Sequence, residues 1–425
     1  MPPFRAPEMT STIAATIGRP RTLRWAGAIV RIAGMILTAA CGLGGAVLGE
    51  DQAAASPRLI LVHYMPWFDA DAGARRWGWH WTMNTYDPNV VKDGRREIAS
   101  KYYPAIGPYD SADPHVIEYH LQLMKIAGID GAIIDWYGIR DLWDYGVIHR
   151  NTGLFVEKAG GYGVKVAICY EDKTIPNLVK EGRIAAGERV SHAVETIDWL
   201  GSHWFPRDHY VRIGGKPLLM SFGHGGLDDA EWSKCLAETV GPVAYFSEHN
   251  RRPSAIGGYD WPIPKDGLAS IERFERKSKD WTQRIPVAFP RFDDIYAEAG
   301  VGANLGRVPD QDGETFRSTL ESSQQMEAPA VQLATWNDWG EGTSIEPSLE
   351  YGTRDLESVQ QHRRRHADPG FAANAADLQL PRRLFELRRN TKGSDEKERL
   401  DRIADLLREG QFDAARAELK NLANR

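Results

Sequence analysis

Residues 329–347 read PAVQLATWNDWGEGTSIEP and decide the fold assignment. The apolar run at the start of this stretch predicts a β-strand, and the residues after it supply three carboxylates, Asp338, Glu341 and Glu346, with two tryptophans and two glycines. Carboxylates transfer protons and tryptophan faces pack against the apolar faces of sugars, so this composition indicates carbohydrate chemistry. A polar loop that only caps the strand is the alternative, although such a cap needs neither the indoles nor the glycines.

Seven further β-rich apolar runs precede this strand and alternate with helix-like stretches. The stretch 116–127 repeats apolar residues every three or four positions, and Asp113-Pro114 before it favours a helix start. Strands that alternate with helices in this way predict a (β/α)8 barrel of the TIM type, an α/β fold. A doubly wound open sheet is the alternative, but no glycine-rich phosphate loop follows the first strand. The predicted strands are residues 59–64, 131–136, 164–170, 217–222, 243–247, 258–261, 286–289 and 330–336.

The residues that follow these strands are mostly aromatic or acidic. The C-terminal ends of barrel strands share the face on which such barrels carry out chemistry, so we expect a wide, negatively charged cleft walled with rings. The tryptophans of the long first loop are predicted to form a sugar-stacking platform at the rim of this cleft. The alternative is that they pack as core residues under the loop. For His63 and His80, a packing role is favoured over a catalytic one. The predicted substrate-binding residues are Tyr64, Trp67, Trp81, Asp135, Trp136, Tyr137, Asp172, Trp261, Asn337, Trp339 and Glu346.

Charge and cysteine usage exclude several classes of partner. The chain has 425 residues and a formal net charge of −6, with acids and bases interspersed, which argues against nucleic acid or an anionic membrane surface as a partner. CxxC, HExxH and histidine–aspartate clusters at metal-ligand spacing are missing from the sequence, so we predict neither a metal nor a cofactor. Cys169 and Cys235 are predicted to be buried free thiols, with a bridge between them as the alternative.

Both ends of the chain extend beyond the predicted barrel domain, residues 57–392. Residues 1–56 place a basic region before an apolar region and small residues, as a secretory signal and linker do. Arg31 shortens the apolar run below the ~20 residues of a membrane span, so we expect a secreted or periplasmic protein, with a lipid anchor at Cys41 as the alternative. Residues 393–425 predict a helical hairpin that docks on the barrel or on a partner, because one hairpin cannot bury its own apolar face.

The motif at 337–347 resembles the bacterial proteins of the glycoside hydrolase family 71/99-like group. Family 99 contains endo-α-mannosidases and endo-α-mannanases on a (β/α)8 barrel, and its motif is roughly Asn-Glu-Trp-x-Glu-Gly-Thr-x-Ile-Glu. The segments 63–67, HYMPW, and 131–138, GAIIDWYG, are similar to the first and second strands of that group, and the resemblance extends over about 59–389. This chain matches the motif at Asn337, Trp339, Glu341, Gly342, Thr343, Ile345 and Glu346.

The resemblance implies catalytic roles for two acids. Glu341 takes the position of the general acid/base, and Asp338 that of a base on the 2-hydroxyl of the substrate, which gives an epoxide-like intermediate and retained stereochemistry. Asp338 departs from the family, which has glutamate there, and a misplacement of about 1 Å can cost two orders of magnitude in rate. Glycoside hydrolysis itself requires one acid for the leaving oxygen and a second carboxylate with a different pKa.

The predicted function is a secreted glycoside hydrolase for an α-linked polysaccharide or glycan, endo-acting and retaining, with an α-mannan-like substrate. Asp338 prompts one alternative, a non-catalytic glycan-binding protein on a hydrolase barrel. An endo-α-1,3-glucanase-like enzyme is another. A glycosyltransferase-type protein is disfavoured by the secretion signal, because nucleotide-sugar donors are cytosolic.

Overall fold

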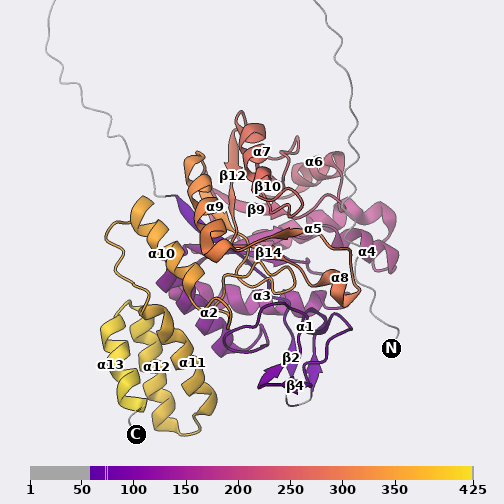
Figure 1. The fold of residues 1–425 in the computed structure, drawn as a ribbon. Coiled ribbons are helices and arrows are strands. Elements are labelled where there is room, and N and C mark those ends of the chain that lie inside the picture. The colour runs from indigo at the N-terminus through magenta and orange to yellow at the C-terminus, as the bar shows by residue number, and fades with distance from the viewer. Residues whose placement is uncertain (1–57, 72, 74, 424–425) are drawn as a thin grey trace, which may run out of the picture. The chain divides into compact units, whose positions relative to one another are not determined.

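The computed structural model describes residues 58–71, 73 and 75–423, and its centre is a ring of parallel strands (Figure 1). The predicted signal segment, with Cys41, lies outside the described residues. The strands pair in parallel in the order β12-β11-β10-β9-β7-β6-β1-β16-β13. Their bounds are β1 (Leu59–Tyr64), β6 (Gly131–Trp136), β7 (Lys165–Tyr170), β9 (Lys216–Ser221), β10 (Ala244–Glu248), β11 (Gly257–Tyr259), β12 (Gln283–Ile285), β13 (Val287–Ala288) and β16 (Ala330–Leu333).

The ring closes through a strand that is interrupted in its middle. β12 and β13 are the two ends of the ladder, yet only Pro286 separates them in the chain. Proline has no N–H to donate, so it breaks the ladder without ending the strand. Its carbonyl still accepts a hydrogen bond of 3.0 Å from Gln332 N of β16. β12 and β13 are therefore one barrel strand, and the predicted (β/α)8 barrel is confirmed.

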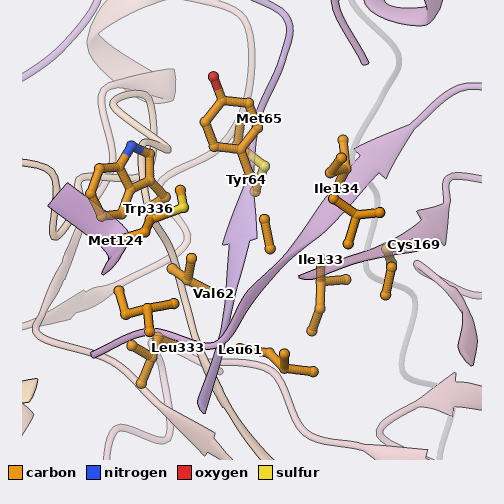
Figure 2. Close-up of a cluster of buried hydrophobic side chains, with 14 of the residues drawn as sticks. Leu61, Val62, Tyr64, Met65, Met124, Ile133, Ile134, Cys169, Leu333 and Trp336 are labelled. Carbon is orange, nitrogen blue, oxygen red and sulfur yellow. The ribbon is translucent and has the colours of Figure 1, made fainter. Parts of the chain in front are cut away.

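Side chains along each barrel strand alternate between the interior and the helix layer. In β1, His63 points inward, where its Nε2 lies 2.9 Å from Gln332 Oε1 of β16. Tyr64 points outward, and its hydroxyl lies 3.1 Å from Nδ1 of His120. This alternation decides which residue at each strand end reaches the barrel mouth. Figure 2 shows apolar side chains between the strands and the helix layer, among them Val62, Leu333 and Met124.

Amphipathic helices cover the outside of the ring. Asp113 begins the first of them, because its side chain accepts a hydrogen bond of 2.8 Å from His115 N, and Gly128 ends it with φ 82°. The predicted helix of this segment is thus confirmed. The helices of the layer are α2 (Pro114–Ala127), α3 (Tyr145–Ala159), α5 (Arg189–His203), α6 (Asp229–Glu238), α7 (Ala269–Ser278), α9 (Glu314–Gln325) and α10 (Arg354–His366). The short elements include α1 (Trp79–Thr82), α4 (Thr174–Lys180), α8 (Tyr296–Ala299), β8 (Arg212–Ile213) and the pairs β2 (Ala70–Asp71) with β3 (Arg76–Trp77), β4 (Val91–Lys92) with β5 (Arg95–Arg96) and β14 (Phe292–Asp293) with β15 (Arg307–Val308).

The C-terminal segment forms three helices that lie side by side, α11 (Leu380–Asn390), α12 (Ser394–Arg408) and α13 (Phe412–Ala423) (Figure 1). The predicted hairpin, α12 and α13, packs on α11, and α12 also contacts α2 of the barrel. Arg388 of α11 joins the three parts, since it pairs with Glu118 of α2 and with Asp401 of α12, each at 2.7 Å. Of the two alternatives for the hairpin, the structure shows docking on the barrel.

Two further observations concern the described residues as a whole. Cys169 and Cys235 are buried free thiols, as predicted. None of the helices over the described residues has the length and apolar character that a bilayer crossing requires.

Candidate active site

The loop after β16 folds back on itself and holds two acids at the barrel mouth. Asp338 Oδ1 accepts a hydrogen bond of 2.9 Å from Glu341 N, a local turn that suits the short aspartate side chain. Gly342 has φ 68°, and a Cβ there would lie 2.7 Å from the carbonyl oxygen of Asp293, so the turn requires glycine. Asp338 is only 4 % exposed and Glu341 8 %. The local sequence thus buries both predicted catalytic acids in one turn.

The two acids differ in their affinity for protons. Burial raises the pKa of Asp338 to about 6, although the backbone amides of Glu341 and Gly340 act in the opposite direction. Burial also raises the pKa of Glu341 well above its usual range, and the Asp338 carboxylate adds to this increase. Among the described residues Glu341 Oε2 is buried without a hydrogen-bond partner. Glu341 therefore keeps its proton to a higher pH than Asp338 does.

Asp135 and Glu171 bring two more acids to the mouth, from the ends of β6 and β7. Burial raises the pKa of Asp135 well above its usual range, and the nearby carboxylates of Glu171 and Asp338 contribute. Lys173 balances part of this charge, since its Nζ lies 3.2 Å from Glu171 Oε1. Oδ1 of Asp135 is buried, and nothing in the described part of the chain forms a hydrogen bond with it. Asp135 thus presents an oxygen without a partner at the mouth, and its predicted hydrogen bond to a sugar hydroxyl stays a prediction.

Aromatic rings line the same end of the barrel. Trp67 stacks on His80 with ring centroids 4.4 Å apart and planes 7° apart, and Tyr137 lies 6.5 Å from Trp67. His80 is close enough to Asp338 to stabilise its charge. On the other side, Trp261 meets the inward-facing His63 edge to face at 4.7 Å. Trp67 and Tyr137 are partly exposed at the mouth, and their predicted role in substrate binding stays a prediction.

Three motif residues that we predicted to bind substrate instead hold the loop in place. Asn337 forms two hydrogen bonds with the backbone of Met65, at 2.8 and 2.9 Å, and a third, of 3.0 Å, with the Tyr109 hydroxyl. The same hydroxyl donates to Glu346 Oε2 at 2.7 Å and accepts from the Trp339 indole at 3.4 Å. The other oxygen of Glu346 lies 3.1 Å from His120 Nε2. Because all three side chains are buried and held by these contacts, we correct the predicted role of Asn337, Trp339 and Glu346 from binding to positioning.

Two aromatic residues predicted to stack on sugars point away from the mouth. Tyr64 faces the helix layer, as described above, and contacts His120. Trp136 follows the inward-facing Asp135, so it also points outward, where its indole donates to His149 Nδ1 at 3.2 Å. Trp136 is 0 % exposed. The period of two along a strand therefore overturns the predicted binding role of both rings.

Trp81 and Asp172 are also buried in structural contacts. The Trp81 indole donates a hydrogen bond of 2.7 Å to the carbonyl oxygen of Tyr109 under the first loop. Trp81 is therefore a core residue, the alternative that we considered for the tryptophans of this loop. Asp172 Oδ2 accepts hydrogen bonds from Leu227 N at 3.0 Å and from the Trp232 indole at 2.8 Å. Both side chains are fully buried, and their predicted binding roles are corrected accordingly.

Comparison with known proteins assigns the chain to a family. The model for glycosyl hydrolase family 99 matches residues 58–243. A glycoprotein endo-alpha-1,2-mannosidase of Rattus norvegicus is 37% identical over 333 residues, which cover 69% of this chain and 69% of the relative. A glycoprotein endo-alpha-1,2-mannosidase-like protein of Mus musculus is 31% identical over 358 residues, 72% of this chain and 74% of the relative. The chain belongs to glycosyl hydrolase family 99. It is thus a glycoside hydrolase, and the resemblance seen in the motif is confirmed.

The fold of this family 99 member also matches a solved structure. The GH99 endo-alpha-mannosidase from Bacteroides thetaiotaomicron superposes with a TM-score of 0.55 at 18% identity, covering 72% of this chain and 97% of the other. This similarity supports the barrel. The match to the family model ends at residue 243, before the loop that carries Asp338 and Glu341. The roles of these acids in the family 99 hydrolase therefore rest on the geometry described above and on the motif.

The structure adds residues to the site that we did not predict. Lys173 is a cation within the acidic mouth, and the only sequence signal for it is its place just after Glu171 and Asp172. Tyr296 is a second addition, because burial and then the charges of Asp338 and Glu341 raise the pKa of its hydroxyl. Its sequence signal is weak, since it follows a broken seventh strand in the chain. His80, which we expected to pack only, stands beside both the aromatic wall and Asp338.

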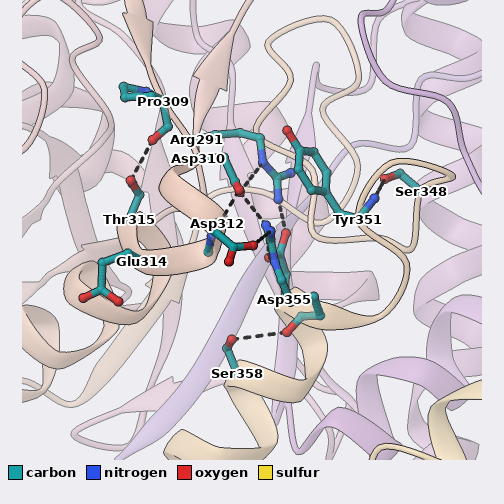
Figure 3. Close-up of polar contacts among 12 residues, drawn as sticks. Arg291, Pro309, Asp310, Asp312, Glu314, Thr315, Ser348, Tyr351, Asp355 and Ser358 are labelled. Atoms are coloured by element: carbon teal, nitrogen blue, oxygen red, sulfur yellow. Dashed lines mark hydrogen bonds and ion pairs between the residues drawn. The ribbon is translucent and has the colours of Figure 1, made fainter.

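A buried arginine holds the loop after β16 of this family 99 hydrolase from behind (Figure 3). Arg291 donates to the carbonyl oxygen of Ser344 at 2.8 Å, within the loop after β16. The same guanidinium pairs with Asp355 at the start of α10 and, at 3.2 Å, with Asp310. It also lies over the Tyr351 ring, 3.7 Å from its centroid. Arg291 is 1 % exposed, so this network fixes the loop without facing the cleft.

Proposed function

We propose that this family 99 hydrolase cleaves internal α-mannosidic bonds with retention of stereochemistry, with Glu341 as general acid/base and Asp338 as the base. The observation that carries the proposal is the pair of buried acids in one turn, of which Glu341 holds the higher pKa. Glycoside hydrolysis needs one acid that keeps its proton beside a second acid that ionises more readily.

The first step under this proposal moves two protons and breaks one bond. Asp338 removes the proton of the substrate 2-hydroxyl, whose oxygen attacks the anomeric carbon while Glu341 protonates the departing glycosidic oxygen. Water then opens the resulting epoxide-like ring, with Glu341 as the base that activates it and Asp338 returning the proton to the 2-oxygen. The low polarity of the buried site strengthens these charge interactions.

Asp338 replaces the glutamate of the family motif, and its surroundings explain how the shorter side chain is held. One carboxylate oxygen accepts the Glu341 backbone N–H at 2.9 Å, so the backbone fixes the direction of the group. Asp338 N in turn donates to Thr335 Oγ1 at 2.8 Å. A base held at both ends loses little freedom when substrate binds, which favours catalysis over binding alone.

The substrate class is proposed from the relatives and from the charge of the mouth. The relatives in Rattus norvegicus and Mus musculus are named as a glycoprotein endo-alpha-1,2-mannosidase and a glycoprotein endo-alpha-1,2-mannosidase-like protein. Acids dominate the mouth, and Lys173 is already paired with Glu171, which suits a neutral, hydroxyl-rich ligand. We therefore propose an α-1,2-linked mannoside within a longer glycan.

The test measures hydrolysis by the full chain on α-1,2-linked mannan oligosaccharides and on α-1,3-glucan. Glu341→Gln should lower kcat on the mannan by a hundredfold or more, the usual scale for a lost general acid, while binding persists in calorimetry. The exposed Glu327→Gln is the matched control and should keep full activity. Proton NMR should show the α-anomer of the product first.

Other outcomes support the alternatives. Binding of the mannan by calorimetry without turnover by the unaltered chain points to the glycan-binding protein. Preferential cleavage of the α-1,3-glucan points to the glucanase-like enzyme. The β-anomer as first product contradicts retention, and full activity of Glu341→Gln removes that residue from catalysis.

We also propose that the protein is exported through its N-terminal segment. The order of basic, apolar and small residues in 1–56 supports this. Mass spectrometry of the mature chain should find it shortened at the N-terminus. A lipid on Cys41 identifies the anchored form, whereas an intact N-terminus contradicts export.

A further inference from the structure

Three side chains of the metal-binding type meet on the outer helix layer. Glu321 comes from α9, and His362 and His366 come from α10. One ligand atom from each, a carboxylate oxygen or an imidazole nitrogen, lies within 4.8 Å of the other two. The cluster does not belong to the barrel mouth, because its residues lie on α9 and α10, two of the helices that cover the outside of the sheet.

We propose that Glu321, His362 and His366 bind a divalent transition-metal ion of the Zn2+ class, with water as the fourth ligand. Histidines four apart lie on one face of a helix, the spacing that many zinc sites use. Two ligands about 2.1 Å from a tetrahedral zinc ion are roughly 3.4 Å apart. His366 Nε2 and Glu321 Oε2 already lie 3.2 Å apart, and the His362 ring centroid is 4.7 Å from that of His366.

Burial and charge set the strength of the site. His362 is buried, so its neighbours hold the imidazole in place beside His366 and Glu321. Glu321 and His366 are partly exposed and leave the ion a path from solvent. Arg365 opposes a cation, since its Nη1 lies 3.8 Å from Glu321 Oε2. Arg58 adds a second positive charge near His362, so we expect an exchangeable site.

The position of the cluster indicates what the ion does. α9 leads into β16, and α10 follows the loop that carries Asp338 and Glu341. An ion shared by the two helices ties together the segments on either side of the catalytic strand, so it stabilises the fold without touching substrate. The histidine pair at 362 and 366 is visible in the sequence, but Glu321 is distant in the chain, so the site of three ligands was not predicted.

Calorimetry of the full chain with Zn2+, after treatment with a chelator, tests the proposal. We expect one equivalent of zinc to bind, and His366→Ala and Glu321→Gln each to weaken binding by at least roughly tenfold. Both residues are partly exposed, so neither variant opens a hole in the core. His203→Ala, which removes an exposed histidine at the end of α5, is the matched control and should bind zinc unchanged. Saturating zinc should raise Tm by roughly 3–5 °C, a shift that the two ligand variants lose.

A second variant moves the affinity in the opposite direction. Arg365→Gln removes the opposing charge from a mostly exposed position and should tighten zinc binding about two- to fivefold. Co2+ in place of Zn2+ should give the visible absorption of a tetrahedral site. The proposal is overturned if zinc does not bind, if both ligand variants bind as tightly as the unaltered chain, or if binding is lost only in Asp338→Asn, which would place the ion at the barrel mouth.

Discussion

Two clusters of buried charge flank the loop after β16, and they differ in how their charges are balanced. On the cleft side, no cation within the described part of the chain contacts Asp338 or Glu341 directly, and burial raises both pKa values. Behind the loop, Arg291 lies between Asp310 and Asp355, and although burial acts the other way, the arginines there keep the pKa of Asp310 low. Balanced buried charge holds a structure together, whereas unbalanced charge costs stability and indicates a reacting site.

Removal of Arg291, which balances the charge behind the loop, should have the largest effect on the free energy of unfolding. Arg291→Met leaves the buried Asp355 and the partly buried Asp310 with Arg354 as their remaining cation and removes the hydrogen bond to Ser344, so we expect unfolding in urea to show a loss of about 3–5 kcal/mol. Arg317→Met, which breaks an exposed pair with Glu314, is the control and should cost less than about 1 kcal/mol. Equal losses for the two variants would show that Arg291 is no more important than a surface arginine.

On the cleft side, removal of a charge should instead stabilise the fold. The pKa of Asp338 is about 6 in the folded chain against an ordinary value of 3.8, so the folded state binds more protons between these values and stability falls as pH rises through that window. Asp338→Asn should therefore be more stable than the unaltered chain by up to about 3 kcal/mol at pH 7. The gain should shrink toward zero near pH 4, as measured by urea unfolding at several pH values.

The same substitution separates stability from chemistry. Asp338→Asn keeps an oxygen for the Glu341 backbone N–H but cannot take a proton, so activity should fall about a hundredfold while stability rises. Asp293→Asn, an acid outside the mouth that pairs with Lys101, is the control for the loss of a carboxylate. A stability gain that does not depend on pH would contradict the assigned pKa of Asp338.

Activity should follow the protonation of the pair. The dependence of kcat/KM on pH should rise through an apparent pKa of about 6, because the base must be ionised. It should fall again at higher pH as Glu341, whose pKa burial and Asp338 raise, loses its proton. The two limbs describe the coupled pair and not either residue alone. A profile that is flat from pH 5 to 7 would exclude Asp338 as the base.

The barrel could be predicted because its signals are local. Apolar runs, the Asp113 cap and the spacing of apolar residues in α2 each depend on a few neighbouring residues. The site was predicted only in part, because strand register decides whether a side chain points into the barrel or toward the helix layer. Asp135 and Trp136 are adjacent, yet one reaches the mouth and the other packs against His149. Asn337 likewise belongs to the motif but bonds to Met65, a contact that no local pattern in the sequence shows.

Trp67 lies at the barrel mouth and Trp136 in the helix layer. Substitution of Trp67 should have the smallest effect on activity, and Trp136 is its control. Trp67 is partly exposed and stacks on His80 at the mouth, so Trp67→Ala should raise KM for the glycan about two- to tenfold, the scale of one aromatic contact, with kcat nearly unchanged. Trp136→Ala should instead leave KM alone in the folded fraction and cost about 3–5 kcal/mol in urea unfolding, because its ring is fully buried among the helices. If Trp67→Ala lowers stability as much as Trp136→Ala and leaves KM unchanged, Trp67 is core, and the aromatic wall of the cleft is confined to Tyr137 and Trp261.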